Sequence, residues 1–186
     1  MKKIACIAMA ATALVATPAM AQSASGTVLV TGVVPGKCTA AGGISGTIDL
    51  GDISNADGTV RGSFSNNVGG LSRSFTIVCT SANVNITVSS DALNNTADST
   101  TGSGYTGRVH YTSTLTANKA GGGTGTAVYT TQDTLPAAST TPLGDRLATG
   151  ANNVTVTVSN GTTTNSGDVL KQGTYNSTIS ITVSPV

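Results

Sequence analysis

Apolar and polar residues alternate along much of the chain, and a period of two is the pattern of β-strands that bury one face. A strand over 75–79 and another over 84–88 show it clearly, and the short link at 80–83 predicts a hairpin between them. Gly, Thr and Asn recur too often for helices. In these two strands the residues expected to face the core are Phe75, Ile77, Cys79, Val84, Ile86 and Val88.

The same alternation continues in the second half of the chain. Val109, Tyr111 and Leu115 share a face over 108–116, and Val154, Val156 and Val158 share a face just before Asn160-Gly161, a dipeptide typical of two-residue hairpins. The final strand is expected to be the longest. Its predicted inward residues are Tyr175, Ile179, Ile181 and Val183.

Weaker segments complete the predicted fold. We expect short strands at 47–51, with Ile48 and Leu50 inward, and at 127–130, after a flexible glycine-rich stretch at 121–125. The polar stretches 89–107 and 131–150 are predicted loops, where specificity would be carried. Seven or eight short strands separated by Gly- and Asn-rich turns predict an all-β, antiparallel sandwich.

The first 21 residues have the parts of a cleavable signal peptide. Lys2 and Lys3 precede an apolar run over 4–16, and small residues follow at 17–21. The run is shorter than the roughly 20 apolar residues of a transmembrane helix, although a membrane anchor remains the alternative. We therefore expect residues 1–21 to direct export and Gln22 to begin the mature chain.

Removing the signal leaves 186 − 21 = 165 residues, a length typical of one domain. Seven basic and eight acidic residues remain, so the mature net charge is 7 − 8 = −1. This nearly uncharged surface gives no footprint for nucleic acid or anionic membranes, and we expect neither as a partner. A net charge so close to zero favours association between copies.

The mature chain holds two cysteines, and in an oxidising compartment Cys38–Cys79 is the expected disulfide. The bond would close a loop of 40 residues, for which the chain-entropy model gives roughly 4 kcal/mol. Zinc binding or redox chemistry would need further ligands or a Cys-x-x-Cys spacing, and the sequence has neither.

Candidate chemistry is sparse. His110 is the one mature histidine, we expect it to be exposed on a strand, and nothing near it resembles a nucleophile elbow. Asp49, Asp52, Asn55 and Asp57 precede Gly58, but their spacing does not match an EF-hand loop, so a polar turn is the better interpretation of this cluster. We expect no enzymatic activity, no cofactor and no metal.

Several segments resemble, in order, those of chaperone–usher pilins, most closely the archaic branch known as spore coat U domain proteins. The apolar stretch 26–32 followed by Cys38 is similar to their N-terminal extension and first strand, and Ile48-Asp49-Leu50-Gly51 to the segment after the first Cys. The strand around Cys79 and the closing run 172–183 also match. The chain departs from the family at its end, where Pro185 predicts that pairing stops near Val183.

The resemblance implies an incomplete immunoglobulin-like sandwich, 34–186, completed by a donor strand from a neighbouring subunit. Residues 22–33 would be the donor extension, with Val28, Val30 and Gly32 inserted and Leu29 and Thr31 on the other side. A shift of one residue would exchange these faces. The apolar side of the C-terminal strand, Tyr175, Ile179, Ile181 and Val183, would line the groove that a chaperone and then a donor strand fill.

The implied function is a structural subunit of an extracellular pilus that serves adhesion or biofilm formation. Its partners would be identical or related pilin subunits, a periplasmic chaperone and an outer-membrane usher, without membrane insertion of the subunit itself. The alternative is a self-contained secreted sandwich that binds a surface glycan. The absence of Trp and the scarcity of other aromatic residues weaken that alternative, because sugar-binding faces commonly stack on aromatic rings.

Overall fold

The computed structural model describes residues 25–64 and 70–186 of the chain. The predicted signal peptide at 1–21 and the first residues of the predicted extension, 22–24, lie outside the described residues. The chain divides into two units, 1–33 and 34–186. In the first unit, residues 25–33 form no strand. None of the described residues belongs to a helix long and apolar enough to cross a bilayer.

The second unit is all-β: its described residues form strands and turns and no helix. The alternating apolar segments of the sequence account for its main strands. The strands are β1 (Cys38–Ala40), β2 (Ser72–Phe75), β3 (Ile77–Cys79), β4 (Val84–Ser90), β5 (Leu93–Asn95), β6 (Thr101–Gly102), β7 (Tyr105–Thr106), β8 (Arg108–Asn118), β9 (Thr124–Thr130), β10 (Ser139–Pro142), β11 (Val154–Thr162), β12 (Val169–Leu170), β13 (Tyr175–Asn176) and β14 (Ile179–Pro185).

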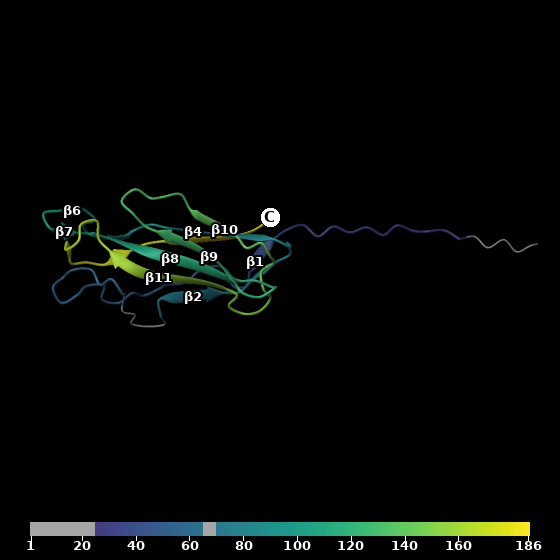
Figure 1. Ribbon diagram of the computed structural model, residues 1–186, viewed down its shortest axis with the longest axis horizontal. Coiled ribbons are helices and arrows are strands. Elements are labelled where there is room, and N and C mark those ends of the chain that lie inside the picture. Colours follow the sequence, from purple (N-terminus) through teal and green to yellow (C-terminus); the bar gives the residue numbers. More distant parts are fainter. Residues whose placement is uncertain (1–24, 65–69) are drawn as a thin grey trace, which may run out of the picture. The chain divides into compact units, whose positions relative to one another are not determined.

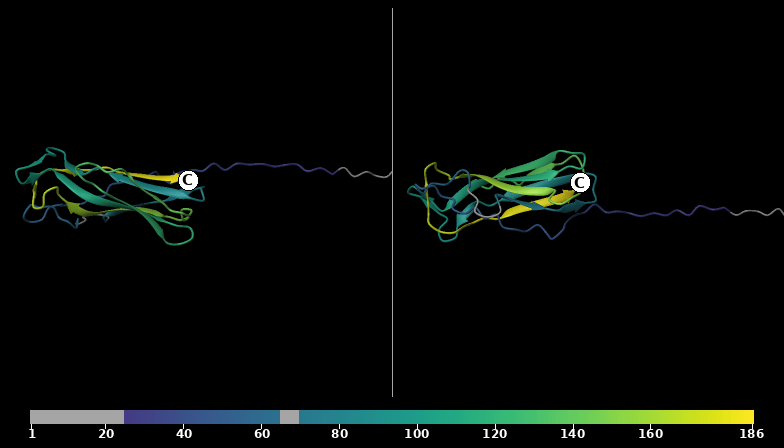
Figure 2. Two further views of the ribbon diagram at one scale, coloured as in Figure 1. Left: turned by 45° about the horizontal axis from the view of Figure 1, so that its top comes forward. Right: turned by 90° about the horizontal axis from the view of Figure 1, so that it is seen from below.

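Two antiparallel sheets form the body of this unit (Figure 1). The larger has the order β13-β5-β8-β11-β2, with β9 also paired to β8, and the smaller has the order β10-β4-β14. The two layers are visible in Figure 2. Two small sheets flank them, β1-β3 and β12-β7-β6, and β12 runs parallel to β7. The antiparallel all-β prediction is therefore confirmed for the main sheets.

The core lies between the two sheets. Val84, Ile86 and Val88 of β4 are fully buried and pack against Leu115 of β8 and Val156 of β11. These positions alternate with half-exposed Thr, Asn and Ser residues, so the period of two correctly predicted which side chains are inside. The predicted inward residues Val109 and Tyr111 form a second cluster with Phe64, Leu93 and Val158.

Two turn predictions are wrong. The link at 80–83 is not a hairpin, because β3 pairs with β1 whereas β4 pairs with β10 and β14, so the link crosses from one sheet to another. Asn160-Gly161 does not end its strand either. Both residues lie within β11 at a break in register between Ser159 and Thr162, where Asn160 has φ 56°. This is a β-bulge.

Packing against residues 61–64 requires glycine at position 161 of this bulge. A Cβ there would lie 2.6 Å from Phe64 Cε1 and 2.8 Å from the Arg61 carbonyl oxygen, so no other residue fits without a shift. The Gly161 amide donates to the Gly62 carbonyl at 3.0 Å. The Asn-Gly dipeptide thus lets residues 61–64 approach the strand closely and does not reverse the chain.

The two predicted loops contain short strands. Residues 89–107 include β5, β6 and β7, and residues 131–150 include β10, an edge strand that pairs with β4. The sequence of β10 is Ser-Thr-Thr-Pro, which has no apolar alternation, and its strand conformation comes from hydrogen bonds to β4. The longest strand is β8, with 11 residues, and not the final strand.

Candidate functional site: an open sheet edge and its groove

The two sides of the sandwich are finished differently. On one side, β9 and β10 approach each other, and the Thr141 hydroxyl donates to the Thr126 carbonyl at 3.0 Å across the gap between the sheets. On the other side, β14 pairs with β4 alone among the described strands. Every second amide and carbonyl of β14 therefore points away from its only partner strand. The outer edge of β14 is therefore an open sheet edge next to the core.

A groove runs along this edge, with a cavity volume of about 820 Å³. It is lined by Ile179 and Ile181 of β14 and by the segment 44–54. Side chains of the larger sheet also line it, including Phe75, Tyr111, Val156 and Val158. The groove therefore opens directly onto the hydrophobic core between the two sheets.

The segment opposite β14 is not the strand that its alternation predicts. Residues 47–51 have no ladder partner, although Ile48 and Leu50 are half-buried against the core, as expected. The Asp49 carboxylate accepts a hydrogen bond from the Gly51 amide at 2.9 Å, and Gly51 has φ 63°, so a local turn ends the extended stretch. The alternation therefore predicted the inward side chains correctly. No strand forms here, because no neighbouring strand of the described residues pairs with residues 47–51.

The predicted C-terminal strand is broken in two. Tyr175 belongs to β13, which pairs with β5 of the larger sheet, whereas Ile179 begins β14 of the smaller sheet. The chain crosses between the sheets at Ser177-Thr178, where Ser177 Oγ donates to the Asp91 carbonyl at 2.6 Å and bonds the Tyr111 hydroxyl at 2.7 Å. These bonds are the physical reason for the break, and burial raises the pKa of Tyr111.

Three of the four predicted inward residues line the groove despite this break. Tyr175, Ile179 and Ile181 line it, and Val183 packs against the main core cluster. The Tyr175 hydroxyl donates to the Lys171 carbonyl at 2.8 Å, which fixes the ring at the end of the groove. The apolar side of the C-terminal run is therefore the inner side of the open edge.

The prediction that pairing stops near Val183 because of Pro185 is wrong. The register continues to Pro185 opposite Val84, and the Val186 amide donates to the Asn83 carbonyl at 3.1 Å. Since amides alternate along a strand, the position of Pro185 is one whose N–H would point away from β4, toward the open edge. The proline removes a donor from that edge and leaves the pairing with β4 intact.

Charged side chains also line the groove. Lys171 Nζ lies 2.7 Å from Asp98 Oδ2, and its hydrogen bond, with those from Thr100, holds the pKa of Asp98 well below its usual range. Bonds from the Ser54 hydroxyl and amide lower the pKa of Asp52 in the same way. Arg73 faces inward opposite Val156 and donates to its neighbouring carbonyl at Ser72. The groove thus combines an apolar strip with charges that have partners inside the domain.

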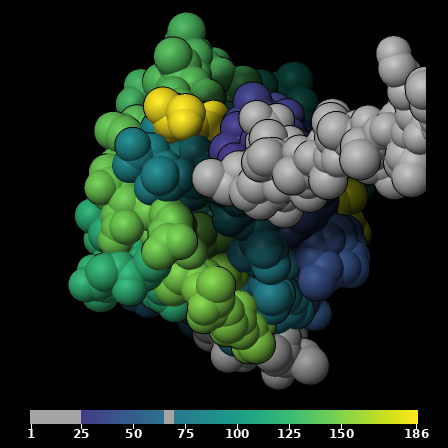
Figure 3. Space-filling model, turned by 90° about the vertical axis from the view of Figure 1, so that its right-hand side faces the viewer, coloured from purple at the N-terminus to yellow at the C-terminus, as the bar shows by residue number. Residues whose placement is uncertain are grey.

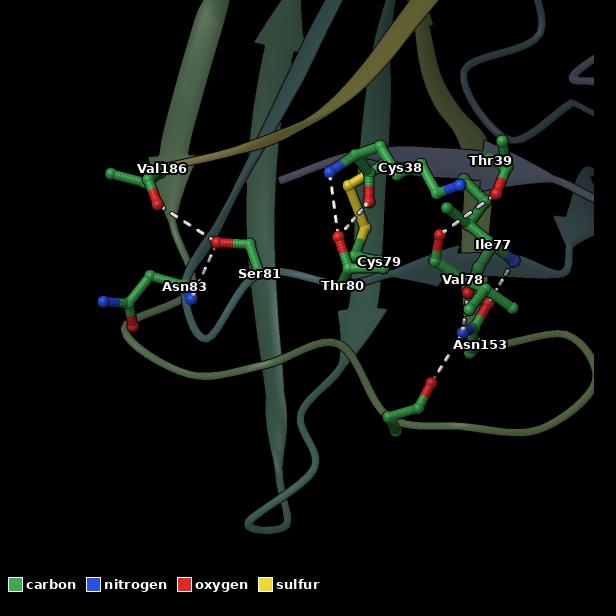
Figure 4. Close-up of a disulfide and its surroundings, with 12 residues drawn as sticks. Cys38, Thr39, Ile77, Val78, Cys79, Thr80, Ser81, Asn83, Asn153 and Val186 are labelled. Carbon is green, nitrogen blue, oxygen red and sulfur yellow. Dashed lines mark hydrogen bonds between the residues drawn. A yellow bond between two sulfur atoms is a disulfide. The ribbon is translucent and has the colours of Figure 1, made fainter. Parts of the chain in front are cut away.

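The predicted disulfide is confirmed. Cys38 and Cys79 are direct cross-strand neighbours in the β1–β3 pair, with Cα atoms 4.1 Å apart (Figure 4). The Lys37 amide donates to Thr80 Oγ1 at 3.0 Å, and the Thr80 amide returns a bond to the Lys37 carbonyl at 2.9 Å. The bond and these contacts fasten a strand of only three residues to the sandwich.

The start of the second unit lies beside the C-terminal end of the open edge. A Cβ at Gly36 would be 3.3 Å from Pro185 Cβ. Ser81 Oγ donates to the Val186 carbonyl at 3.0 Å, and the C-terminal residues, yellow in Figure 3, reach the surface at this end. The first residues of the second unit and the C-terminal residues therefore lie close together at the end of the domain that carries the disulfide.

His110 is buried, so its predicted exposure is wrong. Only 6 % of its surface is accessible, and its Nε2 lies 3.3 Å from Asp133 Oδ1 and 3.2 Å from Thr164 Oγ1. The alternation correctly places it on the outer side of β8, but residues of two loops cover it. Because the carboxylate and the hydroxyl meet the same ring nitrogen, the arrangement is not that of a catalytic triad.

The acidic cluster forms local turns. Asp52 and Asp57 each accept a bond from the amide two residues on, at 2.9 Å from Ser54 and 3.0 Å from Thr59. Within 25–64 and 70–186, no three His, Cys, Asp or Glu side chains gather in a way that could hold a metal ion. The polar turn predicted from the sequence is what these residues form.

The predicted donor residues lie in the first unit, where they form no strand. Val28, Leu29 and Val30 expose 88 %, 86 % and 89 % of their surfaces, and Gly32 is exposed as well. The face with Val28, Val30 and Gly32 and the face with Leu29 and Thr31 are thus equally accessible, so exposure does not indicate which face would be inserted. No family model, curated protein or solved structure matches the chain.

Proposed function

We propose that the chain is a structural subunit of an extracellular pilus, assembled by donor-strand exchange between copies of itself or related subunits. The observation that carries this proposal is the open edge of β14 beside a groove that leads into the core. An apolar sheet edge of this kind is a hazard for a free monomer, because it invites pairing with any exposed strand. In a fibre, the same edge would be the site where one subunit binds the donor strand of the next.

The groove has the features that strand addition uses. Main-chain bonds along β14 supply affinity and register, while alternate side chains of the added strand enter the groove. The domain would then be an immunoglobulin-like sandwich that lacks one strand, and the added strand would lie between β14 and residues 44–54. Burial of three or four such side chains contributes at most roughly 5–8 kcal/mol before the ordering of the strand is counted.

The N-terminal extension has suitable chemistry for this role. Residues 22–36 contain no charged side chain, and the stretch 27–34 is rich in Val. A donor of this composition brings no charge into the apolar strip and has high strand propensity. Val28, Val30 and Gly32 are the inserted residues in our assignment, since Gly32 would let the added strand approach a crowded part of the groove.

Assembly requires that the edge be protected until the fibre grows. The protein would be exported to the periplasm, where a chaperone covers the side of β14 that carries Ile179, Ile181 and Val183. An outer-membrane usher would then exchange the chaperone for the next subunit, and the finished fibre on the cell surface would serve adhesion or biofilm formation. The chaperone and the next subunit would bind the same groove in turn, and neither step needs a cofactor.

Titration of protein that lacks residues 22–33 with a synthetic peptide of residues 24–36 tests the proposal. We expect saturable binding by calorimetry. An Asp in place of Val30 should weaken binding at least about 100-fold, because an unpaired charge would enter the core, and that ratio corresponds to roughly 3 kcal/mol. An Asp in place of Leu29 is the matched control and should bind nearly as the unchanged peptide does.

The pattern of losses separates the possibilities. If the Asp at Leu29 weakens binding and the Asp at Val30 does not, the inserted face is shifted by one residue and the mechanism is unchanged. Absence of binding for every peptide would contradict the proposed function. Saturable binding of a glycan by the truncated protein, without peptide binding, would favour the secreted binding module.

A further inference from the structure

The outer face of the larger sheet carries a regular grid of hydroxyl side chains. The strands β2, β11, β8 and β9 lie side by side, and their registers align the outward residues in three rows across the strands (Figure 1). The rows are Ser74–Thr155–Thr116–Thr126, Ser72–Thr157–Thr114–Val128 and Ser159–Thr112–Thr130. Ten of these eleven positions are Ser or Thr, and we call the eleven positions the hydroxyl face. Thr112 is buried, and the other ten are half-buried or exposed.

No charged side chain interrupts the hydroxyl face. The strand preference of Thr explains individual positions, but natural proteins usually place charges such as Lys on surfaces of this kind to prevent association between sheets. The one apolar member is Val128, which is 51 % exposed. Neighbouring hydroxyls bond each other, Ser74 to Thr155 at 2.8 Å and Thr112 to Thr130 at 3.0 Å, which holds these side chains in fixed orientations.

We infer that the hydroxyl face binds the same face of a second copy in a neighbouring fibre. A hydroxyl both donates and accepts a hydrogen bond, so an array of them is complementary to itself. Two copies have the same twist, and twisted sheets pack face to face with their strands about 30° apart, as in a sandwich core. Two identical faces form a closed, twofold contact, which no net charge opposes.

The size of the hydroxyl face determines when this contact forms. Side chains repeat about every 6.8 Å along a strand and about every 4.8 Å across strands, so the eleven positions cover about 360 Å² per copy. A stable pair of proteins needs about 800 Å² on each partner. One pair of monomers therefore should not associate, whereas fibres that repeat the face gain about 100-fold or more in avidity. This inference rests on the proposed fibre.

The test compares fibres of the unchanged protein with fibres of Thr157→Lys and Thr114→Lys. Both positions are central in the hydroxyl face, and a lysine there makes the two faces repel. Thr140→Lys is the matched control, because Thr140 is exposed on the other sheet. We expect the unchanged and control fibres to form bundles by electron microscopy and low-speed sedimentation, and the two face variants to form single fibres of normal length. High salt should restore bundling by screening the charges.

Each other outcome has a distinct meaning. Unchanged fibres that stay single, or Thr140→Lys fibres that lose bundling as fully as the face variants, contradict the pairing of hydroxyl faces. Face variants that bundle normally contradict it as well. A chain that forms no fibres at all contradicts the proposed function. Electron microscopy distinguishes this result from single, unbundled fibres.

Discussion

Protein that consists of residues 34–186 is expected to be a folded monomer that cannot polymerise, whereas we expect protein of residues 22–186 to form linear polymers. The truncation should leave folding intact, because the disulfide, every strand of the described residues and both core clusters lie within 34–186. It removes the segment that would enter the groove of the next subunit. Size-exclusion chromatography with light scattering measures the difference directly.

A matched control keeps the length of the extension and changes only its chemistry. Replacing Val28, Leu29, Val30 and Val33 with Ser retains all twelve residues of the extension and removes the side chains that would be buried. We expect this variant to be monomeric as well, because main-chain bonds alone do not offset the cost of ordering the strand. Polymerisation of the truncated protein, or of the Ser variant at the unchanged rate, would contradict the role of the extension.

The double substitution of Cys38 and Cys79 with Ser is expected to lower the free energy of unfolding by about 2–5 kcal/mol. The unfolded chain regains the freedom of the loop of 40 residues between them, and the three residues of β1 keep their bonds to β3 and their packing against the core. Urea unfolding of the truncated protein measures the change, because polymer formation does not then obscure the transition.

The nearby substitution Thr39→Ala controls for local disruption of β1. Thr39 is exposed between the cysteine and Ala40, and its loss should change the unfolding free energy by less than about 0.5 kcal/mol. If the cysteine-free protein were as stable as the disulfide-bonded one, the β1–β3 pair would have to be held by the remaining hydrogen bonds. The sandwich would then not depend on an oxidising compartment.

The sequence was informative wherever one face of a strand is buried. Strands β4, β8 and β11 bury Val, Ile and Leu at alternate positions, so their existence and their inward residues follow from the pattern. The disulfide follows from the count of two cysteines outside the predicted signal peptide. The position of the groove-lining residues Ile179 and Ile181 was predictable for the same reason, although the interruption before Ile179 was not.

Long-range contacts determine the features that the sequence did not predict. Asn160-Gly161 has the composition of a hairpin turn, but Phe64, distant in sequence, needs the space at Gly161. His110 alternates with buried neighbours, but Asp133 and Thr164 come from loops that cover its strand. The strand β10 has no apolar pattern and forms because β4 offers it a partner. A local pattern carries no information on such neighbours.

The central claim is that the outward amides of β14 lack a partner strand in the free subunit and gain one from a donor strand. Amide hydrogen exchange of β14 in the truncated protein, with and without the peptide of residues 24–36, tests it most directly. We expect alternate amides of β14 to exchange quickly in the free protein and to become protected when the peptide binds, while those bonded to β4 remain slow throughout. Uniform protection of β14 before any peptide is added, or no change after saturation with it, would contradict the claim.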